Sequence, residues 1–172
     1  AISQFDAQGS FGSIAVQNGT VPLDPESSVP MDVDLVARNV DLQKVTPYAV
    51  LFASLPQDIR LEGIAESTLD ITGEKGTYRI QTQDTQIQNL VLATDANEPF
   101  TQKQVSTSFD VALDPNAKTI NIRTFQLESP QIKIRKGQFT RARQADQMLV
   151  RGSLEGECDW QAVGQVASLA LP

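Results

Sequence analysis

The sequence predicts a mainly β fold, in which a long, curved antiparallel sheet carries one or two short helices on its apolar face. The first observation is that apolar and polar residues alternate along most of the chain, as in strands with one wet face. The second is that short turn signals, such as Asp114-Pro115-Asn116, separate these segments. The third is that only two segments, 42–55 and 160–171, have apolar residues at helical spacing.

The central stretch 31–73 predicts a strand, a short helix and a second strand. In the first strand, Met31, Val33 and Leu35 point to one side and charged residues to the other. Asp41 is a helix N-cap, and Pro47 is expected to divide the helix into two short turns. The helix is expected to pack on the apolar face of the second strand. The residues predicted at this contact are Leu42, Val45, Ala49 and Phe52 of the helix, with Leu61 and Leu69 of the strand.

The other strands are predicted from alternation and bounded by turn signals. Asn18-Gly19 and Gly137 are expected to be turns. The alternation changes phase within 119–127, which predicts a β-bulge near Thr124. The segment 81–89 is very polar, but its Thr and Gln content suits an exposed strand. The further strand segments are 11–21, 77–82, 90–92, 105–113, 131–136 and 148–158.

The two ends of the chain have similar patterns at an offset of 118 residues. Ile14 and Val16 correspond to Ile132 and Ile134, and the capping Asp41 corresponds to Asp159. The pattern predicts one strand-and-helix unit at 1–118, with 31–73 at its centre, and the start of a second similar unit at 119–172. Cys158 corresponds to Val40 and is therefore expected to be a buried apolar residue.

Composition excludes several classes of protein. The 172 residues carry a net charge of −7, which argues against a nucleic-acid partner. There is no histidine, so a His-containing catalytic triad and histidine metal sites are excluded. One cysteine allows neither an internal disulfide nor a cysteine metal cluster. No run approaches the roughly 20 apolar residues of a membrane-spanning helix. Because no initiator Met or signal segment opens the chain, we expect a piece excised from a longer protein.

No pattern of chemistry-bearing residues predicts an enzyme, a cofactor or a metal. Asp32 and Asp34 lie on one face of a strand and could ligate calcium, but no acidic glycine-rich loop accompanies them, so a solvated face is expected. A Ser-Lys catalytic pair and a carboxylate pair of glycosidase type stay formally open. A basic strip is expected to be the wet face of two strands, with anionic lipid head groups as the alternative. Its residues are Lys133, Arg135, Lys136, Arg141 and Arg143.

Five pieces of the sequence resemble the AsmA-like family, which is related to TamB and to the bridge-like lipid-transfer proteins. They are the capping Asp41, the helix end Leu55-Pro56, the run Leu61-Glu62-Gly63, the run 69–73 (LDITG) and the segment 125–137 (FQLESPQIKIRKG). The resemblance covers about half of the chain and rests on apolar patterning and turn glycines. The polar segment QTQDTQIQN departs from the family pattern.

The resemblance implies a periplasmic β-groove protein, tethered to the inner membrane, that moves phospholipid or maintains the outer membrane. The chain would then be a non-enzymatic segment of a bacterial cell-envelope protein, with acyl chains and neighbouring repeat units as its partners. The candidate lipid-facing residues, chosen because they alternate with polar residues on neighbouring strands, are Val105, Phe109, Val111, Ile120 and Ile122. The alternative is a self-contained β-sandwich that serves as a binding or adhesion module of a large secreted or surface protein.

Overall fold

The structure is a computed structural model that describes residues 5–22, 29–53, 58–74, 76–95, 98–144 and 147–170. Within these ranges it describes every side chain except those at 48–53, 143–144, 147–148 and 166–170. Ala49 and Phe52, predicted to pack on the sheet, lie outside the described side chains. The other two helix residues of that prediction, Leu42 and Val45, are half-buried, as are their expected partners Leu61 and Leu69.

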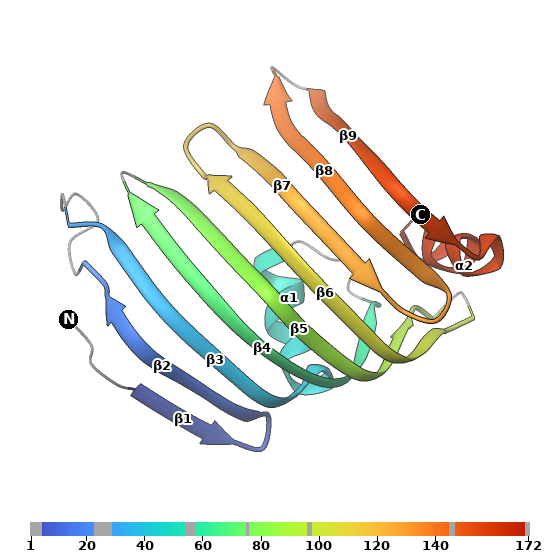
Figure 1. Cartoon of the computed structure of the whole chain (residues 1–172), viewed down its shortest axis with the longest axis horizontal. Helices are drawn as coiled ribbons and strands as arrows, with labels where there is room; N and C mark the ends of the chain where they lie inside the picture. The colour runs from blue at the N-terminus through green and yellow to red at the C-terminus, as the bar shows by residue number, and fades with distance from the viewer. Residues whose placement is uncertain are drawn as a thin grey trace.

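The described residues form nine strands and two helices, and the predicted mainly β fold is confirmed (Figure 1). All nine strands lie in one antiparallel sheet, in which each strand pairs with the next along the chain. The β-sandwich alternative is wrong for these residues because they make a single sheet. The elements are β1 (Phe5–Gly9), β2 (Gly12–Thr20), β3 (Met31–Asp41), α1 (Leu42–Ala53), β4 (Arg60–Glu74), β5 (Thr77–Ala93), β6 (Phe100–Asp114), β7 (Thr119–Glu128), β8 (Ile132–Gln144), β9 (Gln147–Cys158) and α2 (Trp160–Ala170).

Two predicted turns are in fact continuous strand. Asn18-Gly19 lies inside β2, and Gly137 lies inside β8. In both strands the register shifts just before the glycine, between Val16 and Asn18 in β2 and between Ile134 and Lys136 in β8. A glycine beside a β-bulge and a glycine in a turn give the same signal in a sequence, which explains both errors. The structure also adds β1, a strand that alternation did not reveal.

Helix α1 is one helix, and the expected break at Pro47 is wrong. Pro47 removes one backbone hydrogen bond from the helix, and Thr46 stabilises the same turn through its hydroxyl. The Thr46 hydroxyl lies 2.7 Å from the Leu42 carbonyl oxygen and 3.1 Å from that of Leu61 in β4. α1 packs mainly on β4 and lies behind strands β4 to β6 in Figure 1.

The predicted bulge in β7 is confirmed. Asp110 of β6 pairs with Thr124, but Val111 pairs with Ile122, so Arg123 is the extra residue. Because of this extra residue, Ile122 and Phe125 point to the same face of the sheet, although the alternation along β7 changes phase.

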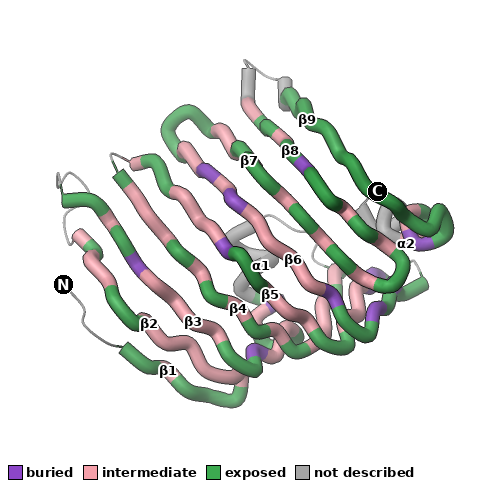
Figure 2. The backbone as a smooth tube through the Cα atoms, viewed as in Figure 1, coloured by how far each residue is buried: buried purple, intermediate pink, exposed green. Residues whose placement is uncertain are grey.

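Few of the described residues are buried, as the colours of the backbone tube in Figure 2 show. No large side chain in the described part of the chain is fully enclosed. Among the described residues, one compact cluster joins Phe100 of β6 to Ala162 of α2, with Leu90, Leu92 and Ile132 packed against it. The buried apolar residues are Val33, Val40, Ala93, Phe100, Val105, Ala112 and Ala162.

One proposed unit would end at position 118, between β6 and β7. The sheet continues there without a break, because β6 pairs with β7. Two features recur at the predicted offset. The first is the helix cap, since Asp41 and Asp159 each accept a hydrogen bond from the backbone N–H of the residue two positions later. The second is a register shift, which follows Val16 in β2 and the corresponding Ile134 in β8. The division into units at 1–118 and 119–172 stays a prediction.

Candidate functional site

The strand register brings apolar residues from most of the sheet onto one side. Directly paired residues of an antiparallel sheet point to the same face. One row of paired residues runs from β3 to β8 through Val33, Ile71, Ile80, Val111, Ile122 and Phe139. Together with flanking rows it forms a surface that we call the apolar face. Its members are Val16, Met31, Val33, Leu35, Leu69, Ile71, Tyr78, Ile80, Phe109, Val111, Leu113, Ile120, Ile122, Phe125 and Phe139.

Four of the five candidate lipid-facing residues lie on the uncovered part of the apolar face. Phe109, Val111, Ile120 and Ile122 are half-buried, and they belong to the neighbouring strands β6 and β7. Val105 differs, since only 3% of it is exposed. Val105 lies in a row with Val40, Ala65 and Ile87, beside the start of α1. Contact of any of the five with lipid stays a prediction.

A band of hydroxyl groups separates the open part of the apolar face from the part beside α1. The Ser67 hydroxyl lies 2.6 Å from that of Thr85, and the Thr82 hydroxyl lies 3.2 Å from that of Thr85. In the same row, Thr107 donates to the Gln126 carbonyl oxygen at 2.8 Å. The polar segment of β5 therefore satisfies its own hydroxyls, which lowers the cost of placing them among apolar side chains.

The opposite face is polar and carries one partly buried ion pair. Arg79 of β5 donates to both carboxylate oxygens of Asp110 of β6, at 2.9 and 2.7 Å. These hydrogen bonds hold the pKa of Asp110 below its usual value, against the opposite effect of burial, and the charges of Arg79 and Arg123 add to the lowering. The same bonds raise the pKa of Arg79. Both groups are therefore ionised at neutral pH and hydrogen-bond to each other. Neither has a pKa near neutral pH, as a general acid or base would need.

Acidic side chains gather beside this pair. Carboxylate oxygens of Asp32, Asp34 and Asp70 lie within 4.8 Å of one another. A hollow of about 640 Å³ over β3 to β7 is lined by Asp34, Asp70 and Asp110 among mostly polar residues. Asp32 and Asp70 are exposed and Asp34 is half-buried, so water solvates this cluster. With one oxygen from each carboxylate, the three aspartates supply fewer ligands than the 6–8 oxygens that calcium takes.

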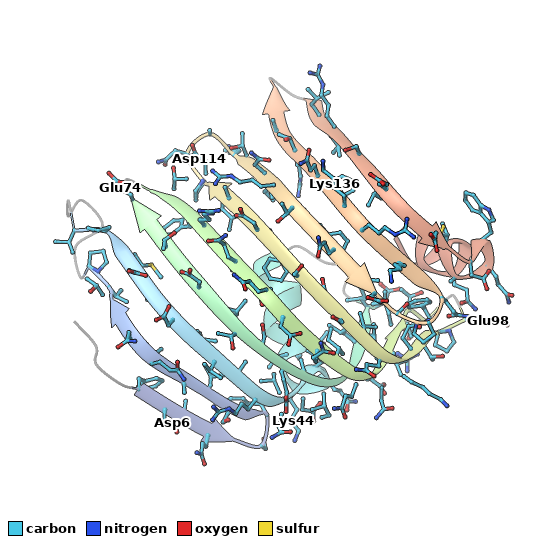
Figure 3. All side chains as sticks on the ribbon, in the orientation of Figure 1. Asp6, Lys44, Glu74, Glu98, Asp114 and Lys136 are labelled. Carbon is cyan, nitrogen blue, oxygen red and sulfur yellow. The ribbon has the colours of Figure 1, made fainter. Side chains whose placement is uncertain are left out.

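Three of the five residues of the basic strip lie beside acidic residues. Lys133 lies 2.7 Å from Glu128 of β7, and Arg135 forms an ion pair with Glu157 of β9. Lys136, labelled on β8 in Figure 3, pairs in register with Glu155. Arg141 pairs with Ile120 and Val150 and therefore lies on the side of the apolar face, so the five residues do not share one wet strand face. The side chain of Arg143 lies outside the described residues.

Sequence reasoning found the apolar face only in part. Leu35, Ile80, Phe125 and Phe139 extend it well beyond the five candidates. Each had an alternation signal in its own strand, but only the register between strands places them in common rows.

No helix in the described part of the chain is both long and apolar enough to cross a membrane. Searches of family models, of curated proteins and of solved structures each found no match to this chain.

Proposed function

We propose that this chain is a non-enzymatic segment of a bacterial cell-envelope protein of AsmA-like type, and that its apolar face holds phospholipid acyl chains. The observation that carries the proposal is the half-exposed apolar face, which spans β2 to β8 and has no second layer of sheet over it among the described strands. Periplasmic location, an inner-membrane anchor on the parent protein, and a role in phospholipid transport or outer-membrane maintenance follow from the resemblance to that family.

The physical support is the free energy of the uncovered surface. Soluble monomers rarely expose contiguous apolar patches larger than a few hundred Å². Burial of apolar surface contributes about 25 cal/mol per Å², or roughly 0.8 kcal/mol for each CH₂ group. An acyl chain laid along the strand rows would therefore gain several kcal/mol from a few methylene groups, without any specific polar contact.

The hydroxyl band divides the apolar face into an open part and a buried part. Beyond Thr82 and Thr85, the row of Val40 and Val105 is already buried. An acyl chain therefore fits on the open side, between the hydroxyl band and the turns that join β4 to β5 and β6 to β7. Most of the charged side chains described on β3 to β8 lie on the opposite face, where they keep the segment soluble. Arg141 is an exception, since it pairs with Ile120 and therefore lies at the margin of the apolar face.

The experiment is photocrosslinking in bacteria. A photocrosslinking amino acid at Phe109 or Ile122 is expected to capture phospholipid. The same group at Ser108 or Asn121, which lie next in sequence but on the polar face, is expected to capture none. Equal capture at all four positions, or none at Phe109 and Ile122, would overturn the proposal and leave the apolar face to a protein partner.

A further inference from the structure

The outermost row of the apolar face lies at the end of the sheet where β4 leads into β5 and β6 into β7 (Figure 1). The strand register places Tyr78, Leu113, Ile120 and Arg141 side by side in this row. Tyr78 and Arg141 each carry a polar group at the tip of a long, partly apolar side chain. The next row inward, which runs through Val111, is apolar from β3 to β8.

The side chains of the outermost row differ in exposure. Tyr78 and Arg141 are exposed, whereas Leu113 and Ile120 between them are half-buried. The ring of Tyr78 covers Gly73 of the neighbouring strand, because a Cβ built there would lie only 2.9 Å from the ring. Side chains with an apolar body on the surface and a polar tip in water are typical of a boundary between hydrocarbon and water.

Arg141 brings a positive charge to the margin of the apolar face. Its partners in register are Ile120 of β7 and Val150 of β9. Among the described residues, no carboxylate belongs to the three rows that run through Leu113, Val111 and Phe109. The guanidinium therefore lies beside apolar surface in a protein whose net charge is −7. This combination suits a ligand with a hydrocarbon part and an anionic group.

We propose that Arg141 binds the phosphate of a phospholipid whose acyl chains run along the strands from the outermost row toward the hydroxyl band. The inference rests on the proposed function and gives the bound lipid a direction, with its head group at the turn end of β4 to β7. A guanidinium binds phosphate through two parallel N–H···O hydrogen bonds, which fix its position as well as its charge. Tyr78 marks the same boundary on β5.

The depth of the open face matches the length of one acyl chain. From Leu113 in the outermost row to Thr107 in the hydroxyl band, β6 covers roughly 20 Å, at about 3.3 Å per residue. The hydrocarbon layer of one membrane leaflet is about 15 Å thick, half of a core of roughly 30 Å. A chain whose head group is held at Arg141 therefore ends near the hydroxyl band, before the buried row behind it.

The opposite direction fits less well. It would place the phosphate at the hydroxyl band, where Ser67, Thr82 and Thr85 already hydrogen-bond to one another. Among the described residues, the row of Ser67, Thr85 and Thr107 contains no cation. The phosphate would then lose its contact with water and gain no opposite charge, which is costly.

The first test measures lipid capture by the purified chain with a photocrosslinking amino acid at Phe109. The probes are dioleoyl phosphatidylglycerol and dioleoylglycerol, which share their acyl chains and differ in the phosphate, and the parent is expected to capture both. Arg141→Gln should lower capture of the phospholipid about three- to tenfold and leave capture of dioleoylglycerol unchanged. Arg151→Gln is the matched control and should change neither, because Arg151 pairs with Thr140 and lies on the opposite face.

The outcomes separate this inference from the proposed function. Unchanged capture of the phospholipid by Arg141→Gln would overturn the inference and leave the proposed function in place. An equal loss of dioleoylglycerol would also overturn it, since Arg141 would then act without the phosphate. Capture of neither lipid by the parent would overturn both.

The second test reads the direction of the lipid on the parent chain. Phosphatidylglycerol with a diazirine at the end of one acyl chain is expected to crosslink near Thr107 and Phe109. The same lipid with its diazirine beside the ester is expected to crosslink near Ile120. The opposite order would overturn the inference even if Arg141→Gln lowers capture.

Discussion

The strand–helix segments β3–α1 and β9–α2 are built alike, but their strands differ greatly in burial. An aspartate caps each helix, Asp41 at the end of β3 and Asp159 directly after β9. The backbone nitrogen of the residue two positions later lies 3.1 Å from Asp41 Oδ1 and 2.9 Å from Asp159 Oδ1. The residue before the cap is 7% exposed in β3, where it is Val40. In β9 it is Cys158, which is exposed, so the expectation of a buried cysteine is wrong.

The difference lies in the neighbours of each strand. β3 pairs with β2 on one side and β4 on the other, whereas β9 pairs only with β8. A single-layer sheet has no second layer to cover its side chains, so burial depends on flanking strands and on the helix at the sheet end. The same local sequence pattern therefore gives a buried residue in the middle of the sheet and an exposed one at its edge.

The largest expected effect is in the one compact cluster. Phe100→Ala should lower the free energy of unfolding by about 3–5 kcal/mol, because Phe100 is buried with Ala162 of α2. Phe5→Ala, on the β1 edge, should cost less than about 1 kcal/mol, since Phe5 is 55% exposed. Urea melts of both variants test this contrast. A similar loss in both would show that edge and middle strands do not differ in burial.

The second prediction concerns the two residues that precede the caps. In the native protein, Cys158 should react with a thiol reagent nearly as fast as a free thiol. A cysteine placed by Val40→Cys, in a Cys158→Ser background, should react at least about 100-fold more slowly, because it must wait for local opening. In urea both should react alike. Equal rates in the native protein would contradict the comparison.

Alternation in the sequence was enough to predict the fold class, the bulge in β7 and both helix caps. Each of these depends on residues close together in the chain, such as Ile122 and Phe125 on either side of Arg123. Turn signals were less reliable because Gly19 and Gly137 have the composition of a turn but lie in strands.

The candidate site was predictable only in part, for a different reason. Phe109 and Ile122 were found from alternation, but the continuity of the apolar face depends on pairings such as Ile80 with Val111 and Ile122 with Phe139. The residues of a strand also do not show whether that strand lies at the edge of the sheet or in its middle. Nothing in the sequence around Cys158 distinguishes it from Val40, and only the topology shows that β9 has one neighbour.

A smaller effect is expected from the two arginine–carboxylate pairs. The Arg79–Asp110 pair lies in the middle of the sheet, with Asp110 buried, and Arg135–Glu157 is exposed at the edge. Asp110→Asn should lower the free energy of unfolding by about 1 kcal/mol at neutral pH. The loss is this small because Arg79 is partly exposed and water screens the pair. Glu157→Gln should change stability by less than about 0.5 kcal/mol.

The pH dependence follows from the lowered pKa of Asp110. A carboxyl group whose pKa is lower in the folded state stabilises the fold above its unfolded pKa, and this contribution is lost as the pH falls through the folded value. The difference between the parent and Asp110→Asn should therefore be constant near neutral pH and shrink below about pH 4. A difference that grows as the pH falls would contradict the assignment of the pair.

The smallest expected effect is that of metal. Melting temperatures in EDTA and in millimolar calcium should coincide, although Asp32, Asp34 and Asp70 lie close together. Asp34 of β3 and Asp70 of β4 are directly opposite in register, and like charges in this position are unfavourable. Asp34→Asn should therefore raise the free energy of unfolding by about 0.5 kcal/mol. If calcium held the cluster together, the same substitution would lower stability in calcium, and the parent would melt several degrees higher with the ion than without it. The sign of the Asp34→Asn effect thus separates a solvated acidic cluster from a metal site, even where the shift in melting temperature is small.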